Sequence, residues 1–405
     1  MGPFRGETIM ALTNRESFHR RIRRTLLGFV AIGLILGCCL EIGCRAQQPW
    51  PLWESYTSRM IDSQGRVIDH SAQDRTTSEG QSYAMFFALV DNDRTRFDQL
   101  LNWTEVNLAG GDLTQHLPAW SWGKNPDGNW KILDHNPAAD ADLWIAYSLL
   151  EAGRLWREPR YDKLGTVMLA RIAQQEVVYV PGLGTTLLSG PVGFHPDEST
   201  WLLNPSYFPP PVLARFAQAM PRGPWGGVLD SLQPLLEQGS GAGFAMDWVA
   251  AGSVIRPSVP PSHLASASQE MPIGSYDAIR VYLWLGIADP DTRGVHALLG
   301  KVPGMANYLK SHVTPPEKVD SNGTIISPNG PPGFSAAVYP YLQALGMNSQ
   351  AKAQIDRLAA TKDPSAGLYG RDGSYYDQNL ALFATGWSEQ RYRFDRDGRL
   401  RVRWK

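Results

Sequence analysis

The feature that most limits how this chain can fold is a long succession of helical patterns separated by Gly/Pro-rich links. After Pro49, about twelve segments repeat apolar residues at helical spacing, and strand patterns are scarce. The expected helices cover residues 52–61, 79–90, 94–108, 138–153, 161–176, 211–220, 225–238, 276–287, 292–312, 334–345, 349–359 and 376–390. Many links are short, and short links force consecutive helices to lie antiparallel. The sequence therefore predicts an all-α fold, in which six antiparallel helix pairs would form a ring of inner and outer helices.

Strands are expected only as minor β-hairpins. Residues 177–180 and 185–188 have strand-like composition, and the tail from Tyr392 alternates around a turn at 395–398. No low-complexity tract or interdomain linker follows Pro49. Residues 47–405 are therefore predicted to form a single domain.

In such a ring every inner helix begins at the same end, so acids in the first helical turns would gather at one mouth. The stretch Thr76–Tyr83 places a hydroxyl cap, Thr77 or Ser78, just before Glu79. Taken alone, Glu79 is an ordinary first-turn carboxylate. It gains interest because two further acids occur in the same local setting.

The second acidic helix start contains Asp140 and Asp142. Asn136 is expected to cap this helix, with Pro137 at the first helical position. Residues two apart do not share a helix face, so both acids cannot reach one substrate atom. One of them should face the cleft, while the other braces a loop or faces solvent.

The third helix start contains Asp277, with Ser275 as the expected cap and Arg280 on the same face. A neighbouring arginine favours the ionised form of an aspartate. This arrangement suits a catalytic base and equally a structural ion pair.

Paired carboxyl groups with different protonation states are what glycosidic cleavage needs, one as acid and one as base or nucleophile. The helix N-terminus would lower the pKa of Glu79, which is the wrong direction for an acid at neutral pH. Burial or a nearby carboxylate must then raise that pKa, and Asp140 is a candidate for the second role.

Aromatic residues are abundant, with 14 Trp and 15 Tyr. Several lie in stretches rich in Gly, Pro and Asn, at 118–130 and 198–207, which we expect to be loops. Such rings either stack on sugars or pack the loops. The candidates are Trp120, Trp122, Trp130, Trp201 and Tyr207.

Charge and composition exclude several functions. Charged residues make up 19% of the chain and the net charge is −1, so nothing global attracts it to nucleic acid. The eight His residues show neither an HExxH motif nor paired ligand spacing, so we expect no metal and no cofactor. A monomer is expected.

The N-terminal residues are predicted to form an export signal. A cluster of four arginines within 20–24 precedes the uncharged run Thr25–Leu40, which is typical of a secretory signal peptide with cleavage after Ala46. An uncleaved N-terminal anchor is the alternative for residues 1–46, although the apolar run is short for a membrane span. The three cysteines lie within this segment, so a chain beginning after Ala46 would have no thiol. We expect a periplasmic or secreted protein.

Several of these stretches together resemble glycoside hydrolase family 8. The matching stretches are 77–83, 117–120, 138–156, 180–184, 204–207, 275–280, 315–320 and 333–337. The resemblance extends from about Trp50 to the end of the chain. It implies an (α/α)6 barrel, an inverting mechanism and β-1,4-glucan as substrate. One departure is Ala139, where the family usually has Ser or Thr.

The resemblance also implies roles for individual residues. Glu79 would be the general acid and Asp277 the general base that activates water. Asp140 would bind the distorted sugar and help to keep Glu79 protonated, and Arg280 and Tyr207 would hold the water and the base in place. The sugar-binding tryptophans implied with less specificity are Trp120, Trp122 and Trp201.

The function expected from this resemblance is an exported endo-1,4-β-glucanase that edits cellulose during bacterial cellulose biosynthesis, in contact with a cellulose synthase complex. Two alternatives remain. The chain could be a non-catalytic glucan-binding assembly factor of the cellulose export machinery, built on the same fold. It could also be a family 8 hydrolase that acts on mixed-linkage glucan or xylan.

Overall fold

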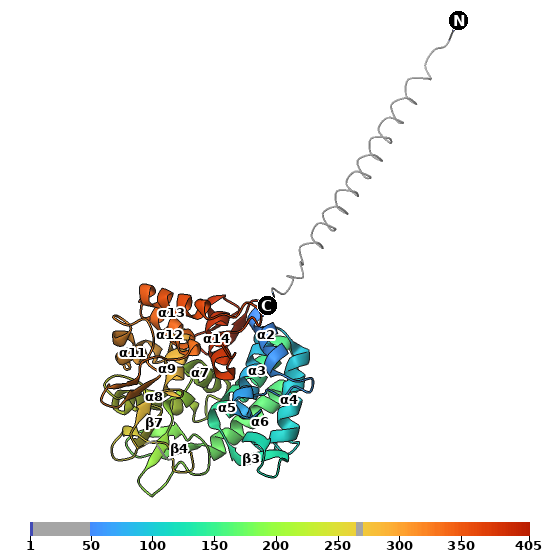
Figure 1. Cartoon of the computed structure of the whole chain (residues 1–405). Coiled ribbons are helices and arrows are strands. Elements are labelled where there is room, and N and C mark those ends of the chain that lie inside the picture. The colour runs from blue at the N-terminus through green and yellow to red at the C-terminus, as the bar shows by residue number, and fades with distance from the viewer. Residues whose placement is uncertain (3–48, 265–269) are drawn as a thin grey trace. The chain divides into compact units, whose positions relative to one another are not determined.

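Helices dominate the unit Pro49–Lys405 of the computed structural model, which describes residues 1–2, 49–264 and 270–405 (Figure 1). The predicted signal or anchor, residues 1–46, lies outside the described residues except at its first two positions. None of the helices in the described ranges is both long and apolar enough to cross a membrane.

Inner helices form a ring in which each contacts the next and the last contacts the first. In chain order they are α3 (Ser78–Val90), α5 (Ala139–Trp156), α7 (Pro210–Ala219), α9 (Ala278–Ile287), α12 (Pro332–Ala344) and α14 (Tyr375–Ser388). An outer layer packs against this ring. It consists of α2 (Pro51–Met60), α4 (Arg94–Leu108), α6 (Pro159–Gln175), α8 (Trp225–Gly239), α10 (Val295–Leu299), α11 (Pro303–Tyr308) and α13 (Asn348–Ala360). The predicted all-α fold, an (α/α)6 barrel of antiparallel pairs, is confirmed.

Large aromatic side chains fill the middle of the barrel. Phe86 of α3 stacks on Phe383 of α14 with ring centroids 5.3 Å apart, and Trp144 of α5 lies 5.3 Å from Trp284 of α9. These rings have at most 1% exposed surface. A helix that is apolar on every side belongs inside a protein, and nearly every residue of α3 and α9 is buried. Truncating one of these rings would cost about 3–5 kcal/mol of stability.

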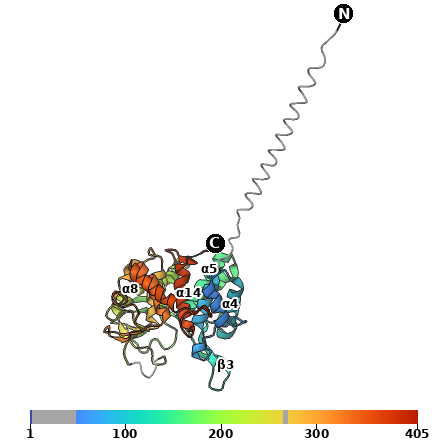
Figure 2. The same cartoon turned by 45° about the horizontal axis from the view of Figure 1, so that its top comes forward.

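Short antiparallel sheets connect the helices. They consist of β1 (Thr76–Thr77), β2 (Ala119–Lys124) and β3 (Trp130–Pro137); β4 (Val177–Val180) and β5 (Gly184–Leu187); β6 (Trp201–Leu203), β7 (Trp248–Ala251) and β8 (Arg256–Ser258); β9 (Ile273–Gly274), β10 (Lys318–Asp320) and β11 (Ile325–Ser327); β12 (Tyr392–Phe394) and β13 (Leu400–Val402). Strands β1, β3 and β9 lead directly into α3, α5 and α9, so they form part of the mouth where the inner helices begin. The β2–β3 hairpin extends beyond the helices (Figure 2).

The structure corrects three expectations about local structure. Residues 292–312 form two short helices, α10 and α11, rather than one, because Pro303 has no amide hydrogen to continue a helix and instead begins a new one. The tryptophan-rich stretch 118–130 is not a loop, since most of it pairs as β2 and β3. Trp201 likewise lies in a strand, β6. In all three places long-range pairing or proline chemistry overrode the local pattern.

Candidate active site

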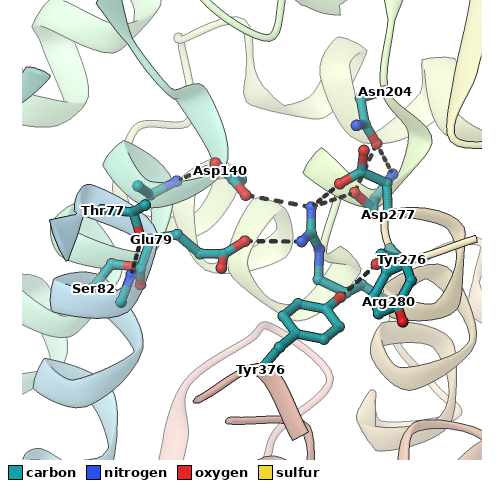
Figure 3. Close-up of polar contacts among 12 residues, drawn as sticks. Thr77, Glu79, Ser82, Asp140, Asn204, Tyr276, Asp277, Arg280 and Tyr376 are labelled. Atoms are coloured by element: carbon teal, nitrogen blue, oxygen red, sulfur yellow. Dashed lines mark hydrogen bonds and ion pairs between the residues drawn. The ribbon is translucent and has the colours of Figure 1, made fainter. Parts of the chain in front are cut away.

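Three acidic helix starts meet around the guanidinium of Arg280 (Figure 3). Its Nη1 donates a 2.8 Å hydrogen bond to Glu79 Oε2, and its Nη2 donates one of 2.8 Å to Asp277 Oδ1. Asp140 Oδ2 lies 3.6 Å from the same Nη2. Four of the residues singled out in the sequence, from α3, α5 and α9, are therefore neighbours. We call Arg280, Glu79, Asp140 and Asp277 the Arg280 cluster.

The start of α3 fixes the position of Glu79. Thr77, rather than Ser78, is the cap, because Thr77 Oγ1 accepts a 3.2 Å hydrogen bond from the amide of Gly80. Gly80 is required here, since a Cβ at this position would lie 2.4 Å from the hydroxyl of Tyr375. Glu79 therefore lies in the first turn of α3, at the end of the barrel where the inner helices begin.

The start of α5 differs from the sequence expectation. Neither Asn136 as cap nor Pro137 as first helical residue is correct, because both belong to β3 and α5 begins at Ala139. The amide of Ala139 donates to the carbonyl of Ser189 at 3.0 Å instead. Asp140 follows, and its Oδ1 accepts a 2.8 Å hydrogen bond from the amide of Ala141.

The start of α9 is also capped from elsewhere in the chain. Ser275 was expected to supply the cap, but Asp247 does so: its Oδ1 accepts 2.8 Å hydrogen bonds from the amides of Ser275 and Ala278. Burial, followed by the nearby charge of Asp277, raises the pKa of Asp247 to about 7. Sequence reasoning missed Asp247 because it precedes α9 by some thirty positions and carries no motif of its own.

Arg280 is held by a further group that sequence reasoning did not assign. Its Nη2 also donates to Ser206 Oγ at 2.9 Å, and Ser206 Oγ donates to Asn204 Oδ1 at 2.7 Å. The ring of Tyr207 lies 5.9 Å from the guanidinium, within cation–π range. The sequence signals were the family-like stretch 204–207 and the ability of Asn204 to build a local turn before Pro205, which it does by accepting from the amide of Ser206.

Burial divides the Arg280 cluster into an inner and an outer part. The side chains of Arg280 and Asp140 are 4% and 6% exposed, while those of Glu79 and Asp277 are 20% and 31% exposed. Figure 3 shows Arg280 between Glu79 and Asp277, so the guanidinium separates these two carboxyl groups. The more accessible pair is the one predicted to act as acid and base.

Burial is the main cause of the raised pKa that Glu79 needs in order to act as an acid. Burial raises the pKa of Glu79 to about 7, Arg280 opposes this shift, and the negative charge of Asp140 adds to it. Burial likewise raises the pKa of Asp140 to about 6 against the effect of Arg280. The predicted contribution of Asp140 to Glu79 is present, and desolvation is the larger cause. Glu79 can therefore hold a proton near neutral pH.

The aromatic candidates lie at the rim, each with a protein neighbour. Trp122 stacks on Trp130 with centroids 4.9 Å apart, and Trp201 stacks on His195 at 4.5 Å. Trp120 lies 5.5 Å from the guanidinium of Arg75. One face of Trp122 and one face of Trp201 are thus covered by a protein ring, and any sugar would have to use the other face. Their proposed roles stay predictions.

The chemistry of the cluster is that of carboxyl groups and one fixed cation. Within the described ranges, no group of three or more His, Cys, Asp or Glu side chains forms a candidate metal site. A protonated acid and a second carboxylate, held apart at the mouth of an (α/α)6 barrel, define a site suited to acid–base cleavage of a glycosidic bond.

Comparisons with known proteins agree with a site that cleaves glycosidic bonds. The family model described as glycosyl hydrolases family 8 matches residues 32–390. A protein named endoglucanase from Xanthomonas axonopodis pv. citri is 46% identical over 358 residues, which is 88% of this chain and 90% of the relative. A protein of the same name from Escherichia coli K12 is 42% identical over 93% of this chain and 96% of its own.

A solved structure has the same fold as this chain. The crystal structure of an endo-1,4-D-glucanase from Vibrio fischeri ES114 superposes with a TM-score of 0.76 at 39% identity, covering 88% of this chain and 99% of that one. The chain belongs to glycosyl hydrolases family 8, a family of inverting glycoside hydrolases.

Proposed function

We propose that this protein is an exported endo-1,4-β-glucanase that hydrolyses internal β-1,4 bonds of cellulose. In this proposal Glu79 is the general acid and Asp277 the general base. The observation that carries it is the pair of accessible carboxyl groups held on different nitrogens of the buried Arg280. The relatives named endoglucanase support the choice of substrate class.

The roles follow from the surroundings of each carboxyl group. Glu79, with its pKa raised by burial to about 7, would donate its proton to the leaving glycosidic oxygen. Asp277, the more exposed of the two, would take a proton from the water that attacks the opposite face of the sugar. Inverting enzymes hold these carboxyl groups roughly 6.5–9.5 Å apart to make room for that water. The guanidinium lying between them favours such a separation.

Asp140 and Arg280 would act together on the sugar at the cleavage point. Asp140 lies deeper than either partner and its negative charge helps to keep Glu79 protonated. Arg280 binds all three acids, so sugar binding would exchange part of this network for contacts with the substrate. Tyr207 packs beside the guanidinium and would limit its movement.

Turnover of a panel of polysaccharides tests the substrate assignment. We expect reducing ends to be released from carboxymethylcellulose faster than from lichenan, xylan or chitosan, with the α-anomer formed first in the NMR spectrum. A faster reaction on xylan or lichenan would move the assignment to another family 8 activity. Well-folded protein that releases no reducing ends from any of them would favour the glucan-binding assembly factor.

We further propose that residues 1–46 direct export and that the enzyme acts beside a cellulose synthase complex. The support for export is the arginine cluster and the uncharged run that follows it. Fractionation of cells that express the full chain, combined with N-terminal sequencing, tests this. A cytoplasmic chain with its first residues intact would contradict export.

A further inference from the structure

A second pair of carboxyl groups lies beside the Arg280 cluster. Asp142 is two residues beyond Asp140 on α5, and Glu176 directly follows the last residue of α6. Neither has any exposed surface. The two side chains lie within hydrogen-bonding range of each other, so the start of α5 meets the end of its antiparallel partner here.

No cation within residues 49–264 and 270–405 balances this pair. Among the described residues, no other hydrogen-bond donor reaches any of the four carboxyl oxygens, and neither acid takes part in an ion pair. Two adjacent carboxylates in a dry interior would be far too costly to bury, so the pair must hold at least one proton. A carboxyl group that is protonated can then donate to its neighbour, which would give a partner to oxygens that otherwise have none.

The surroundings favour the protonated form. Within the described part of the chain, Asp140 on α5 is the only ionisable group besides the two partners whose charge acts on either acid, and its negative charge opposes their ionisation. No charged group of the other described elements packed here does so. Burial, the largest cause, raises the pKa of Glu176 to about 8 and raises that of Asp142 as well. Glu176 also follows the C-terminus of α6, the negative end of a helix dipole.

We propose that Asp142 and Glu176 are positioning residues which share a proton and so hold the first turn of α5, and with it Asp140, in place beside Arg280. The inference rests on the role proposed above for Asp140. The carbonyl of Glu176 also accepts a 2.8 Å hydrogen bond from the amide of Leu188, and the next residue, Ser189, accepts from the amide of Ala139. The segment 188–189, which binds the first residue of α5, is therefore also hydrogen-bonded to the backbone of Glu176.

This arrangement makes the position of Asp140 sensitive to the shared proton. Asp140 lies 3.6 Å from Arg280 Nη2, so a small movement of the helix start would change that contact, and misplacement by about 1 Å can cost 10²-fold in rate. Acids whose pKa is raised by folding stabilise the protein fully below their unfolded pKa, and that stability is lost as the pH rises through the folded pKa. The pair should therefore loosen in alkaline solution.

The first test needs no substrate. At pH 7 we expect the wild-type infrared spectrum to contain a protonated-carboxyl contribution that is lost in the double variant Asp142→Asn, Glu176→Gln, seen in the difference spectrum because Glu79 and Asp247 also hold protons near this pH in both proteins. The melting temperature of the wild type should fall between pH 6 and pH 9 by roughly 4 °C more than that of the double variant, whose amides keep a hydrogen bond but do not titrate. Asp162→Asn, an exposed acid on α6, is the matched control and should behave as the wild type.

The second test measures positioning. We expect Glu176→Ala to lower kcat about 10-fold with KM changed by less than about twofold, and Glu176→Gln to restore kcat to within about threefold of the wild type. Unchanged kcat in folded Glu176→Ala would overturn the positioning role. An identical infrared spectrum and pH dependence of melting in the wild type and the double variant would overturn the shared proton.

The two tests separate this inference from the proposed function. If the wild type released no reducing ends, the proposed function would fail, while the infrared and melting experiments would still decide whether the pair shares a proton. A wild type that is active but shows no kcat loss in Glu176→Ala would fail only the inference.

Discussion

Helix α5 carries an ionic cluster near each end, and the two are built in opposite ways. At its start, Asp140 joins the Arg280 cluster, in which three acids surround one cation. Towards its end lies Glu151, which binds Arg154 and Arg215 and accepts a 2.8 Å hydrogen bond from the amide of Leu400. We call Glu151, Arg154 and Arg215 the Glu151 cluster.

Charge balance is the difference that matters. In the Glu151 cluster two cations and a backbone amide satisfy one acid that has no exposed side-chain surface. In the Arg280 cluster negative charge is in excess, and two of its acids stay partly exposed. The first arrangement fastens the C-terminal hairpin to the barrel. The second leaves acids that are costly to ionise and open to a ligand, which is typical of sites that perform chemistry.

Removing the proposed acid should have the largest effect. We expect Glu79→Gln to lower kcat on carboxymethylcellulose by at least about 10³-fold, because a positioned general acid contributes on the order of 10²–10⁴-fold. The melting temperature should stay the same or rise, since a buried acid in excess is removed. Cello-oligosaccharide binding, measured by calorimetry, should persist. Activity near that of the wild type would exclude Glu79 as the acid.

The matching change in the Glu151 cluster should lower stability and leave kcat nearly unchanged. We expect Glu151→Gln to lower the free energy of unfolding by about 3 kcal/mol, because buried Arg215 loses its charged partner. Its kcat per folded molecule at 25 °C should stay within about twofold of the wild type. Denaturant unfolding and single-temperature kinetics measure the two quantities. A large loss of kcat without loss of stability would contradict the contrast between the clusters.

The pH dependence should test the acids of the Arg280 cluster. Because Glu79 must be protonated to act, and its pKa is raised to about 7, kcat/KM should fall about tenfold per pH unit above that value. Stability should fall over the same range, since Glu79 and Asp140 have folded pKa values above their unfolded ones and their contribution is lost as the pH rises. A pH–rate profile that is flat from pH 6 to 9 would rule out this assignment of the acid.

The rim aromatics should give the smallest effect. If Trp201 supports a sugar with the face not covered by His195, Trp201→Ala should raise KM for a soluble cello-oligosaccharide about 3–10-fold. Its kcat should change little, because the ring lies outside the Arg280 cluster. Steady-state kinetics with oligosaccharides of increasing length would show at which length the loss appears. No change at any length would leave Trp201 as a packing residue.

The sequence alone predicted most of the helices and the acids of the Arg280 cluster, although it missed the division of residues 292–312 into α10 and α11. Apolar spacing and short links predicted the ring of helix pairs, and positions at the expected helix starts identified Glu79, Asp140, Asp277 and Arg280. These signals are local: a cap, a turn and a repeat each depend on residues a few positions apart. The family resemblance supplied their proposed roles, which geometry alone did not assign.

Only the tertiary structure decided which groups surround those acids. Asp247 caps α9 from a distant segment, Ser206 holds Arg280, and Glu176 faces Asp142. The rise in the pKa of Glu79 likewise comes mainly from burial, a property of the assembled barrel rather than of any stretch of sequence. The physical reason is that desolvation and charge act through space, so their sources can lie anywhere along the chain.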